Sequence, residues 1–162
     1  MLEYPFDSAL ILRKKKSIKK NLLLKDNFIE RKIVILGGST TSEIKNILEL
    51  FLLDNGIKAD FYESDYNQFY EEALFGNDVL DKFNPDIVYI HTTNQNIRKY
   101  PELQDNESEI NILLSNEIER YKSIWASLAK FDCAIIQNNF DLTLDRSLGN
   151  LDCSDIHGKT YF

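Results

Sequence analysis

Short runs of apolar residues alternate along the chain with longer segments in which apolar residues recur every three or four positions. The runs predict buried strands, and the longer segments predict amphipathic helices. The expected strands are residues 32–36, 57–62, 87–90 and 133–137. The expected helices are residues 42–54, 107–130 and 68–82, the last interrupted at Gly76 and Asn77. Strands that alternate with helices favour a parallel sheet with right-handed crossovers, and therefore an α/β fold.

Residues 1–31 precede the first strand and are predicted to form a helical entry segment, with a helix from Asp7. This helix carries the sequence RKKKSIKK over residues 13–20, which has six positive charges. Because the formal net charge of the whole chain is −7, the remaining residues sum to −13. A solvated helix face explains the basic run, and a docking patch for an acidic partner or a phosphate group is the alternative. Residues 32–162 are expected to form the α/β domain.

Composition narrows the classes of function. A chain of 162 residues fits one domain, and its negative charge argues against a nucleic-acid-binding protein, which needs a positive surface. No run of about 20 apolar residues occurs, so no membrane-spanning helix is expected. The apolar stretch before the basic run is too short for a secretory signal, and Cys133 and Cys153 lack metal-ligand spacing. These features predict a cytoplasmic protein with reduced cysteines and no metal site.

The first strand is followed directly by two glycines and by a run of hydroxyl residues over 39–42. The carboxyl end of a strand in an open α/β sheet is where ligands bind, and the next helix N-terminus offers free N–H groups to an anion. Ser39 is therefore a candidate nucleophile. Capping of the helix is the other interpretation, because Thr40 and Glu43 have the spacing of a capping box.

Two further strands end in polar residues, which a parallel sheet would bring to the same edge as Ser39. His91 and Asn94 follow the third strand, and Asn138 and Asn139 follow the fourth. Asn94 is a candidate donor to an oxyanion, and His91 is a candidate base for the serine. Asparagines at strand ends also often satisfy loop backbone groups, which is the alternative for all three.

The second candidate base is His157, which lies two residues after Asp155. In an extended segment this spacing can place the carboxylate and the imidazole on one face. An ordinary surface turn at His157 and Gly158 is the alternative interpretation.

Longer stretches of the chain resemble the N-terminal region of FkbH-like proteins, which resembles the SGNH-hydrolase fold and precedes a phosphatase-like domain of the haloacid dehalogenase superfamily. The stretches that carry the resemblance are 4–7 (YPFD), 36–44 (LGGSTTSEI), 61–68 (FYESDYNQ), 135–140 (IIQNNF), 148–152 (LGNLD) and 154–158 (SDIHG). Gly37-Gly38-Ser39 stands where SGNH hydrolases have Gly-Asp-Ser. Thr92-Thr93-Asn94 stands where they have Gly-x-Asn, and Asp155-Ile156-His157 is one residue shorter than their Asp-x-x-His.

The resemblance implies a three-layer α/β/α domain with a flavodoxin-like, SGNH-hydrolase-like parallel sheet, which in the family continues through another helix and strand. It implies a serine-centred site that handles a small acyl or glyceryl-type unit, as an ester or thioester, in polyketide or surface-polysaccharide or lipid biosynthesis. Ser39, Asn94, Asp155 and His157 would be the catalytic residues. The residues expected to contact the substrate are Gly38, Thr40, His91, Asn138 and Asn139.

The resemblance also implies an acyl carrier protein or a small acyl donor as the partner. A non-catalytic module that docks such a partner for a phosphatase-like domain is the alternative function. The chain has no Asp-x-Asp-x-Thr phosphatase motif, so Mg²⁺ is expected only in a downstream domain and no cofactor is expected in this chain. An unpaired edge of the sheet would invite self-association, which makes a homodimer a further expectation.

Overall fold

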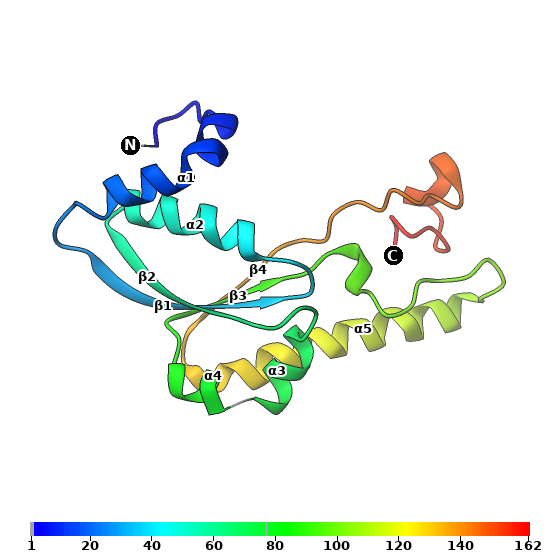
Figure 1. Ribbon diagram of the computed structural model, residues 1–162. Helices are drawn as coiled ribbons and strands as arrows, with labels where there is room; N and C mark the ends of the chain where they lie inside the picture. Colours follow the sequence, from blue (N-terminus) through cyan, green and yellow to red (C-terminus); the bar gives the residue numbers. More distant parts are fainter. Residues whose placement is uncertain (1, 77) are drawn as a thin grey trace.

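The computed structural model of the chain describes residues 2–76 and 78–162. Its four strands form one parallel sheet in the order β2-β1-β3-β4, which confirms the expected α/β class (Figure 1). The strands are β1 (Ile29–Gly37), β2 (Ile57–Glu63), β3 (Ile87–His91) and β4 (Ala134–Gln137).

Helices cover both faces of this sheet and complete the expected three-layer α/β/α arrangement (Figure 1). On one side lie α1 (Ser8–Leu22) and α2 (Ser42–Asp54), and on the other lie α3 (Phe69–Phe75), α4 (Asp78–Phe83) and α5 (Glu107–Leu128). The predicted interruption of the 68–82 helix is observed, since α3 ends at Phe75 and Gly76 has φ +65°. Asn77, the other residue of that prediction, lies outside the described residues.

β1 begins at Ile29, three residues before the expected start of the strand, and the expected boundary between entry segment and domain falls inside it. Its first residues are exposed, but they pair in register with β2, beginning with Ile29 beside Ile57. The apolar pattern did not predict this part of the strand, because Glu30 and Arg31 are charged. After β4 the chain forms one short 3-10 helix, η3 (Gly149–Cys153), within the described residues.

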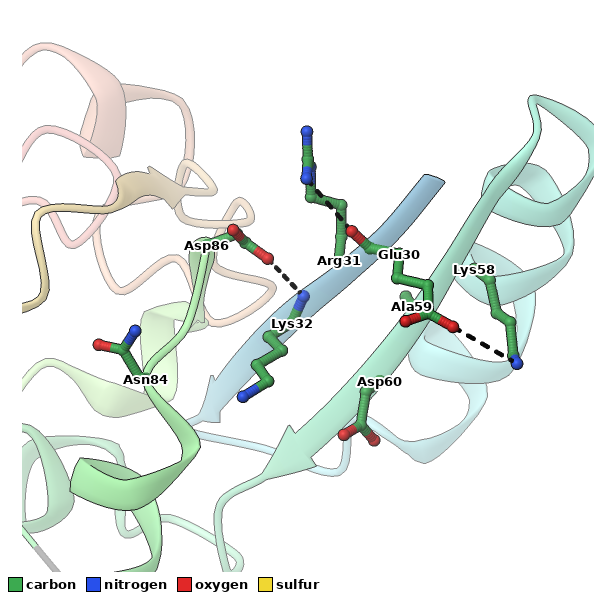
Figure 2. Close-up of a pocket in the computed structure, with 8 residues that line it drawn as sticks. All are labelled: Glu30, Arg31, Lys32, Lys58, Ala59, Asp60, Asn84 and Asp86. Atoms are coloured by element: carbon green, nitrogen blue, oxygen red, sulfur yellow. Dashed lines mark hydrogen bonds and ion pairs between the residues drawn. The ribbon is translucent and has the colours of Figure 1, made fainter. Parts of the chain in front are cut away.

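The amino ends of the strands border a cavity of about 610 Å³ (Figure 2). Ser39 and Asn94 follow the opposite, carboxyl ends of their strands. The wall of the cavity mixes both charges, and several of them already have partners: Lys58 lies 3.9 Å from Glu30, and Asp86 accepts a hydrogen bond of 2.7 Å from the backbone N–H of Lys32. In parallel sheets ligands bind at the carboxyl ends of the strands, so we assign no function to this cavity.

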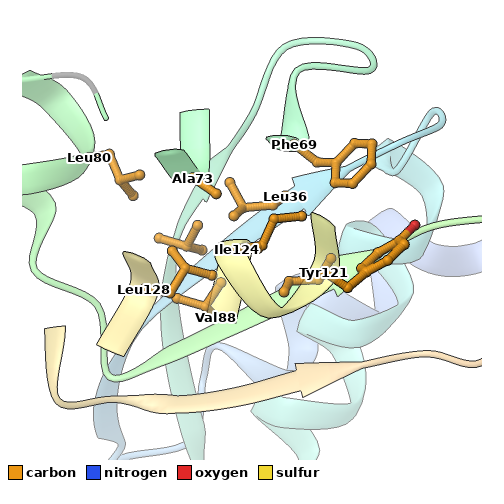
Figure 3. Packing of buried hydrophobic residues seen from close by; sticks show 10 residues of the cluster. Leu36, Phe69, Ala73, Leu80, Val88, Tyr121, Ile124 and Leu128 are labelled. Carbon is orange, nitrogen blue, oxygen red and sulfur yellow. The ribbon is translucent and has the colours of Figure 1, made fainter. Parts of the chain in front are cut away.

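Most core side chains lie between the sheet and the α3–α5 layer (Figure 3). Val34, Leu36 and Val88 are fully buried there and pack against Ile124 and Leu128 of α5. Because successive side chains of a strand point to opposite faces, the alternate residues of β1 face the α2 layer. A second cluster joins the two helices on that side, and its buried members are Ile11, Leu22, Leu50 and Leu53.

Candidate functional site

Ser39 lies in the loop between β1 and α2, directly beyond the last pairing of the strands. The Gly37 N–H donates to Ser64 Oγ at 2.9 Å, and the Gly38 N–H donates to the His91 carbonyl oxygen at 2.8 Å. Ser39 itself is half-buried, and its hydroxyl forms no hydrogen bond with any residue in the described ranges. These two bonds tie the backbone just before Ser39 to the end of β3 and to the loop after β2, and they leave the Ser39 hydroxyl available.

The hydroxyl run after Ser39 does not form the expected capping box. The residue that precedes α2 is Thr41, whose side chain makes no capping hydrogen bond, while Thr40 is exposed. Instead Thr41 Oγ1 donates to Glu63 Oε1 at 2.7 Å, and Ser42 Oγ donates to the same oxygen at 3.2 Å. These bonds tie the start of α2 to the end of β2 and so fix the loop that carries Ser39.

Glu63 completes this attachment as a charged group. Burial raises the pKa of its carboxyl, but the hydrogen bonds from Lys45 and Thr41 and the charge of Lys45 outweigh burial, and the pKa lies below its ordinary value. Lys45 forms a short ion pair with Glu63 Oε2. Since both oxygens of Glu63 are occupied, we assign it a positioning role and not a chemical one.

Asn96, which the sequence analysis did not single out, contacts the Ser39 loop. Its Nδ2 donates to the Gly38 carbonyl oxygen at 2.9 Å and to Asn67 Oδ1 at 3.1 Å, and its Oδ1 accepts from the Thr93 N–H at 2.8 Å. A Cβ at position 38 would lie only 2.4 Å from Asn96 Oδ1, so glycine is required there for this approach. The amide of Asn96 therefore joins the loops that follow β1, β2 and β3.

Asn94 points elsewhere. It begins the short 3-10 helix η1 (Asn94–Asn96), and its Nδ2 donates to the carbonyl oxygens of Asp141 and Leu142 at 3.3 and 3.2 Å. The expected oxyanion donor is thus hydrogen-bonded to the segment after β4, while the asparagine two positions later contacts the loop of the candidate nucleophile. The repeat Asn94-Gln95-Asn96 was the sequence signal that could have raised this alternative.

Asn138 and Asn139 lie together with Asn94 at a cavity of about 420 Å³ beside the carboxyl ends of β3 and β4. Asn138 continues the pairing of these strands, because its Oδ1 accepts from the Thr92 N–H at 2.9 Å and its Nδ2 donates to the Thr92 carbonyl at 2.7 Å. Burial, with a contribution from Asp141, raises the pKa of Tyr100 in this cavity to about 12. The sheet thus brings Asn94, Asn138 and Asn139 together, as expected, at a cavity of ligand size.

His91 ends β3 beside Gly37 of β1, and Tyr89 Oη lies 3.1 Å from its Nδ1. Burial lowers the pKa of the imidazole and the charge of Asp141 opposes this effect, with a lowered pKa as the result. The ring is therefore neutral at physiological pH and able to accept a proton.

Asp155 and His157 pair, with Oδ1 and Nδ1 2.8 Å apart, but they do so in a turn, the alternative interpretation, and not in an extended segment. The other ring nitrogen of His157 lies 3.0 Å from the Asp105 carbonyl oxygen. The hydrogen bonds to Asp155 and to the Asp105 backbone raise the pKa of the imidazole. The pair therefore fastens the C-terminal segment to the loop before α5, and neither ring nitrogen is free to meet Ser39.

Within the described residues, no group of three or more His, Cys, Asp or Glu side chains is arranged to hold a metal ion. No helix formed by those residues has both the length and the apolar character needed to cross a membrane.

Comparison with known proteins supports the description of the fold but does not assign a family. No family model matches the chain, and no curated protein matches it. Among solved structures it is similar to the N-terminal part of the protein BF1531 from Bacteroides fragilis, described as containing a phosphatase domain complexed with Mg. The TM-score is 0.70 at 18% sequence identity over 91% of this chain, and the match spans 38% of that chain. The chain thus has the α/β fold of one part of a phosphatase-domain protein.

Proposed function

We propose that this chain is the SGNH-hydrolase-like N-terminal domain of an FkbH-like protein and handles a small acyl or glyceryl-type unit at Ser39. The free Ser39 hydroxyl at the carboxyl end of β1 is the observation that carries the proposal. The stretches of resemblance and the fold shared with the N-terminal part of a phosphatase-domain protein support it.

In the proposed reaction, Ser39 Oγ attacks the carbonyl carbon of an ester or thioester and its proton passes to His91. The imidazole accepts this proton at Nε2, which is free in the tautomer whose Nδ1–H donates to Tyr89 Oη. The backbone N–H groups at the start of α2 stabilise the oxyanion. The Asn96 amide, whose two N–H groups donate to Gly38 and Asn67, holds the loop that carries Ser39. When the leaving group takes the proton from His91, an acyl-Ser39 intermediate remains for transfer to water or to an acceptor.

The proposed substrate contacts are Gly38 and Thr40 at the loop, and Asn138 and Asn139 at the neighbouring cavity. These steps draw on side chains of this chain alone. Mg²⁺ would belong to a downstream phosphatase-like domain, and an acyl carrier protein or a small acyl donor in the cytoplasm would supply the unit.

A serine-reactive fluorophosphonate tests the proposal, because only an activated serine reacts with it quickly. We expect one adduct by intact mass, located at Ser39 by peptide mapping and lost in Ser39→Ala. Ser115→Ala is the matched control, since Ser115 is an exposed serine of α5 outside the Ser39 loop, and it is expected to leave labelling intact. His91→Gln should slow labelling at least tenfold. An adduct that persists in Ser39→Ala, or no adduct at all, would contradict a nucleophilic Ser39.

A non-catalytic binding module is the second candidate, and the position of His157 favours it. In SGNH hydrolases the Asp-x-x-His histidine serves as the base, whereas both ring nitrogens of His157 are occupied by Asp155 and Asp105. A binding module would retain its affinity for an acyl carrier protein in Ser39→Ala and would show no labelling in the wild type. That pair of results would replace the first proposal by the second.

A further inference from the structure

α1 runs beside α2 in the same direction and is held by two ion pairs, and a third ion pair lies just after its C-terminal end. Lys15 lies 2.6 Å from Glu43, Lys19 lies 2.6 Å from Glu49, and Lys25 lies 2.9 Å from Asp54. Glu43 belongs to the first turn of α2, which directly follows the Ser39 loop. The first half of α1 therefore lies at the same edge of the molecule as the candidate site (Figure 1).

The basic run of α1 divides into bound and free charges. Lys15 and Lys19 form ion pairs with Glu43 and Glu49 of α2. Arg13, Lys14, Lys16 and Lys20 are exposed, and no carboxylate in the described part of the chain lies within ion-pair distance of them. Lys14 lies to one side, whereas the spacing of three and four residues places Arg13, Lys16 and Lys20 on one face of the helix. We call these three residues the α1 stripe.

The α1 stripe lies on the exposed side of α1, although its Lys16 also borders the cavity between α1 and α2 that Asn46 and Glu49 line. The buried residues of α1 are Ile11 and Leu22, which pack in the cluster with Leu50 and Leu53 of α2. α1 thus lies on α2 and leaves its outer face uncovered (Figure 1). The three cations of the stripe form no ion pair within the described residues, although the formal net charge of the chain is −7.

We propose that the α1 stripe docks an acidic surface of the protein that delivers the acyl unit, and thereby places that unit at the Ser39 edge. The inference rests on the proposed function, to which it adds a docking surface. Complementary charge steers association and fixes orientation, which is the contribution that a row of exposed cations can make. A partner held along α1 meets the start of α2 and the Ser39 loop at the end of the stripe that begins with Arg13.

A protein partner fits these features better than an anionic membrane. An interfacial helix binds by burying its apolar face in the lipid, but the apolar face of α1 is already packed against α2. The residues outside the basic run sum to −13, so a broad anionic surface would repel most of the molecule. A narrow acidic ridge on a protein can contact the stripe alone.

The test compares two variants of equal charge. The first reverses the α1 stripe with Arg13→Glu, Lys16→Glu and Lys20→Glu. The control reverses three exposed cations elsewhere, with Lys82→Glu, Lys99→Glu and Arg146→Glu. Lys15 and Lys19 stay unchanged in both, because their ion pairs hold α1 on α2.

The probe is a purified acyl carrier protein in its holo form, with affinity measured at 50 mM and 500 mM salt. Reversal of the stripe should weaken binding at least tenfold at low salt and much less at high salt, while the control stays within twofold of the wild type. Equal effects of the two variants, or no effect of either, would overturn the proposal. Vesicles with about 30% phosphatidylserine serve as the other arm, and loss of vesicle binding alone would assign the stripe to a membrane instead.

Labelling of Ser39 by the fluorophosphonate separates this proposal from the one on which it rests. The stripe lies outside the chemistry, so its reversal should leave labelling unchanged. If the wild type is labelled but the stripe variant binds the carrier protein with unaltered affinity, the docking proposal is refuted and the nucleophile proposal is not. Absence of labelling in the wild type would refute the nucleophile and leave the binding comparison valid.

Discussion

Replacement of Gly38 by alanine is expected to break the contact between the Ser39 loop and Asn96. An alanine Cβ would lie 2.4 Å from Asn96 Oδ1 and 2.6 Å from both Cγ and Nδ2. Gly38 is not among the residues with positive φ, so the substitution strains no dihedral and acts through this collision alone. Because the Asn96 side chain is short and held by hydrogen bonds at both polar atoms, it must leave its position.

The cost follows from the bonds that the Asn96 amide would lose. Three of its hydrogen bonds are between 2.8 and 3.1 Å long, and they join it to Gly38, Asn67 and Thr93. A typical net contribution is about 1 kcal/mol each, and access of water to this edge reduces the sum. We expect Gly38→Ala to lower the free energy of unfolding by about 2 kcal/mol, which is a fall in Tm of about 4–8 °C for a chain of this size.

A double-mutant cycle isolates the cause. Asn96→Ala removes the three atoms nearest to the new Cβ, and alone it should also cost about 2 kcal/mol. The double variant should then cost about 2 kcal/mol and not the additive 4, which corresponds to a coupling of about 2 kcal/mol between the two positions. Urea unfolding monitored by circular dichroism measures all four proteins. Additive costs, or a Gly38→Ala protein within about 0.5 kcal/mol of the wild type, would refute the contact.

Two further predictions concern pH. The pKa of Glu63 is lowered in the folded chain, so its stabilisation is present above the unfolded-state pKa of about 4.3 and is lost as pH falls through the folded value. The difference in unfolding free energy between wild type and Glu63→Gln should therefore shrink below about pH 4, and a difference that grows there would contradict the assignment. The pKa of His157 is raised, so its stabilisation is present below about pH 6.5 and is lost as pH rises through the folded value. The difference between wild type and His157→Gln should disappear at alkaline pH, with an NMR titration of the ring giving a pKa above its ordinary value; an ordinary value would rule out the proposed fastening of the C-terminal segment.

The apolar pattern was sufficient for the sheet because each strand contains an apolar run, which β1 buries continuously and β3 buries at alternate positions. It missed the start of β1, where exposed Glu30 and Arg31 are held by backbone pairing and not by burial. Such pairing depends on a neighbouring strand that is distant in sequence. The start of a strand at the rim of a sheet is therefore hard to predict from local composition.

The candidate site was predictable at the level of strand ends but not of individual side chains. Ser39 and Asn138 lie at the carboxyl edge because a parallel sheet must bring these loops together. The single turn of η1 decides which asparagine contacts the Ser39 loop, because it directs the Asn94 amide to the segment after β4 and the Asn96 amide to Gly38. The attachment of Thr41 to Glu63 likewise spans 22 residues. No local spacing contains such information.

The proposed function depends most directly on whether Ser39 transfers an acyl group. The measurement is turnover of a small acyl thioester by the wild type and by Ser39→Ala, with circular dichroism to verify that both proteins are folded. The account predicts that turnover falls to the uncatalysed rate in Ser39→Ala while the fold is retained. Unchanged turnover in a folded Ser39→Ala protein would contradict it.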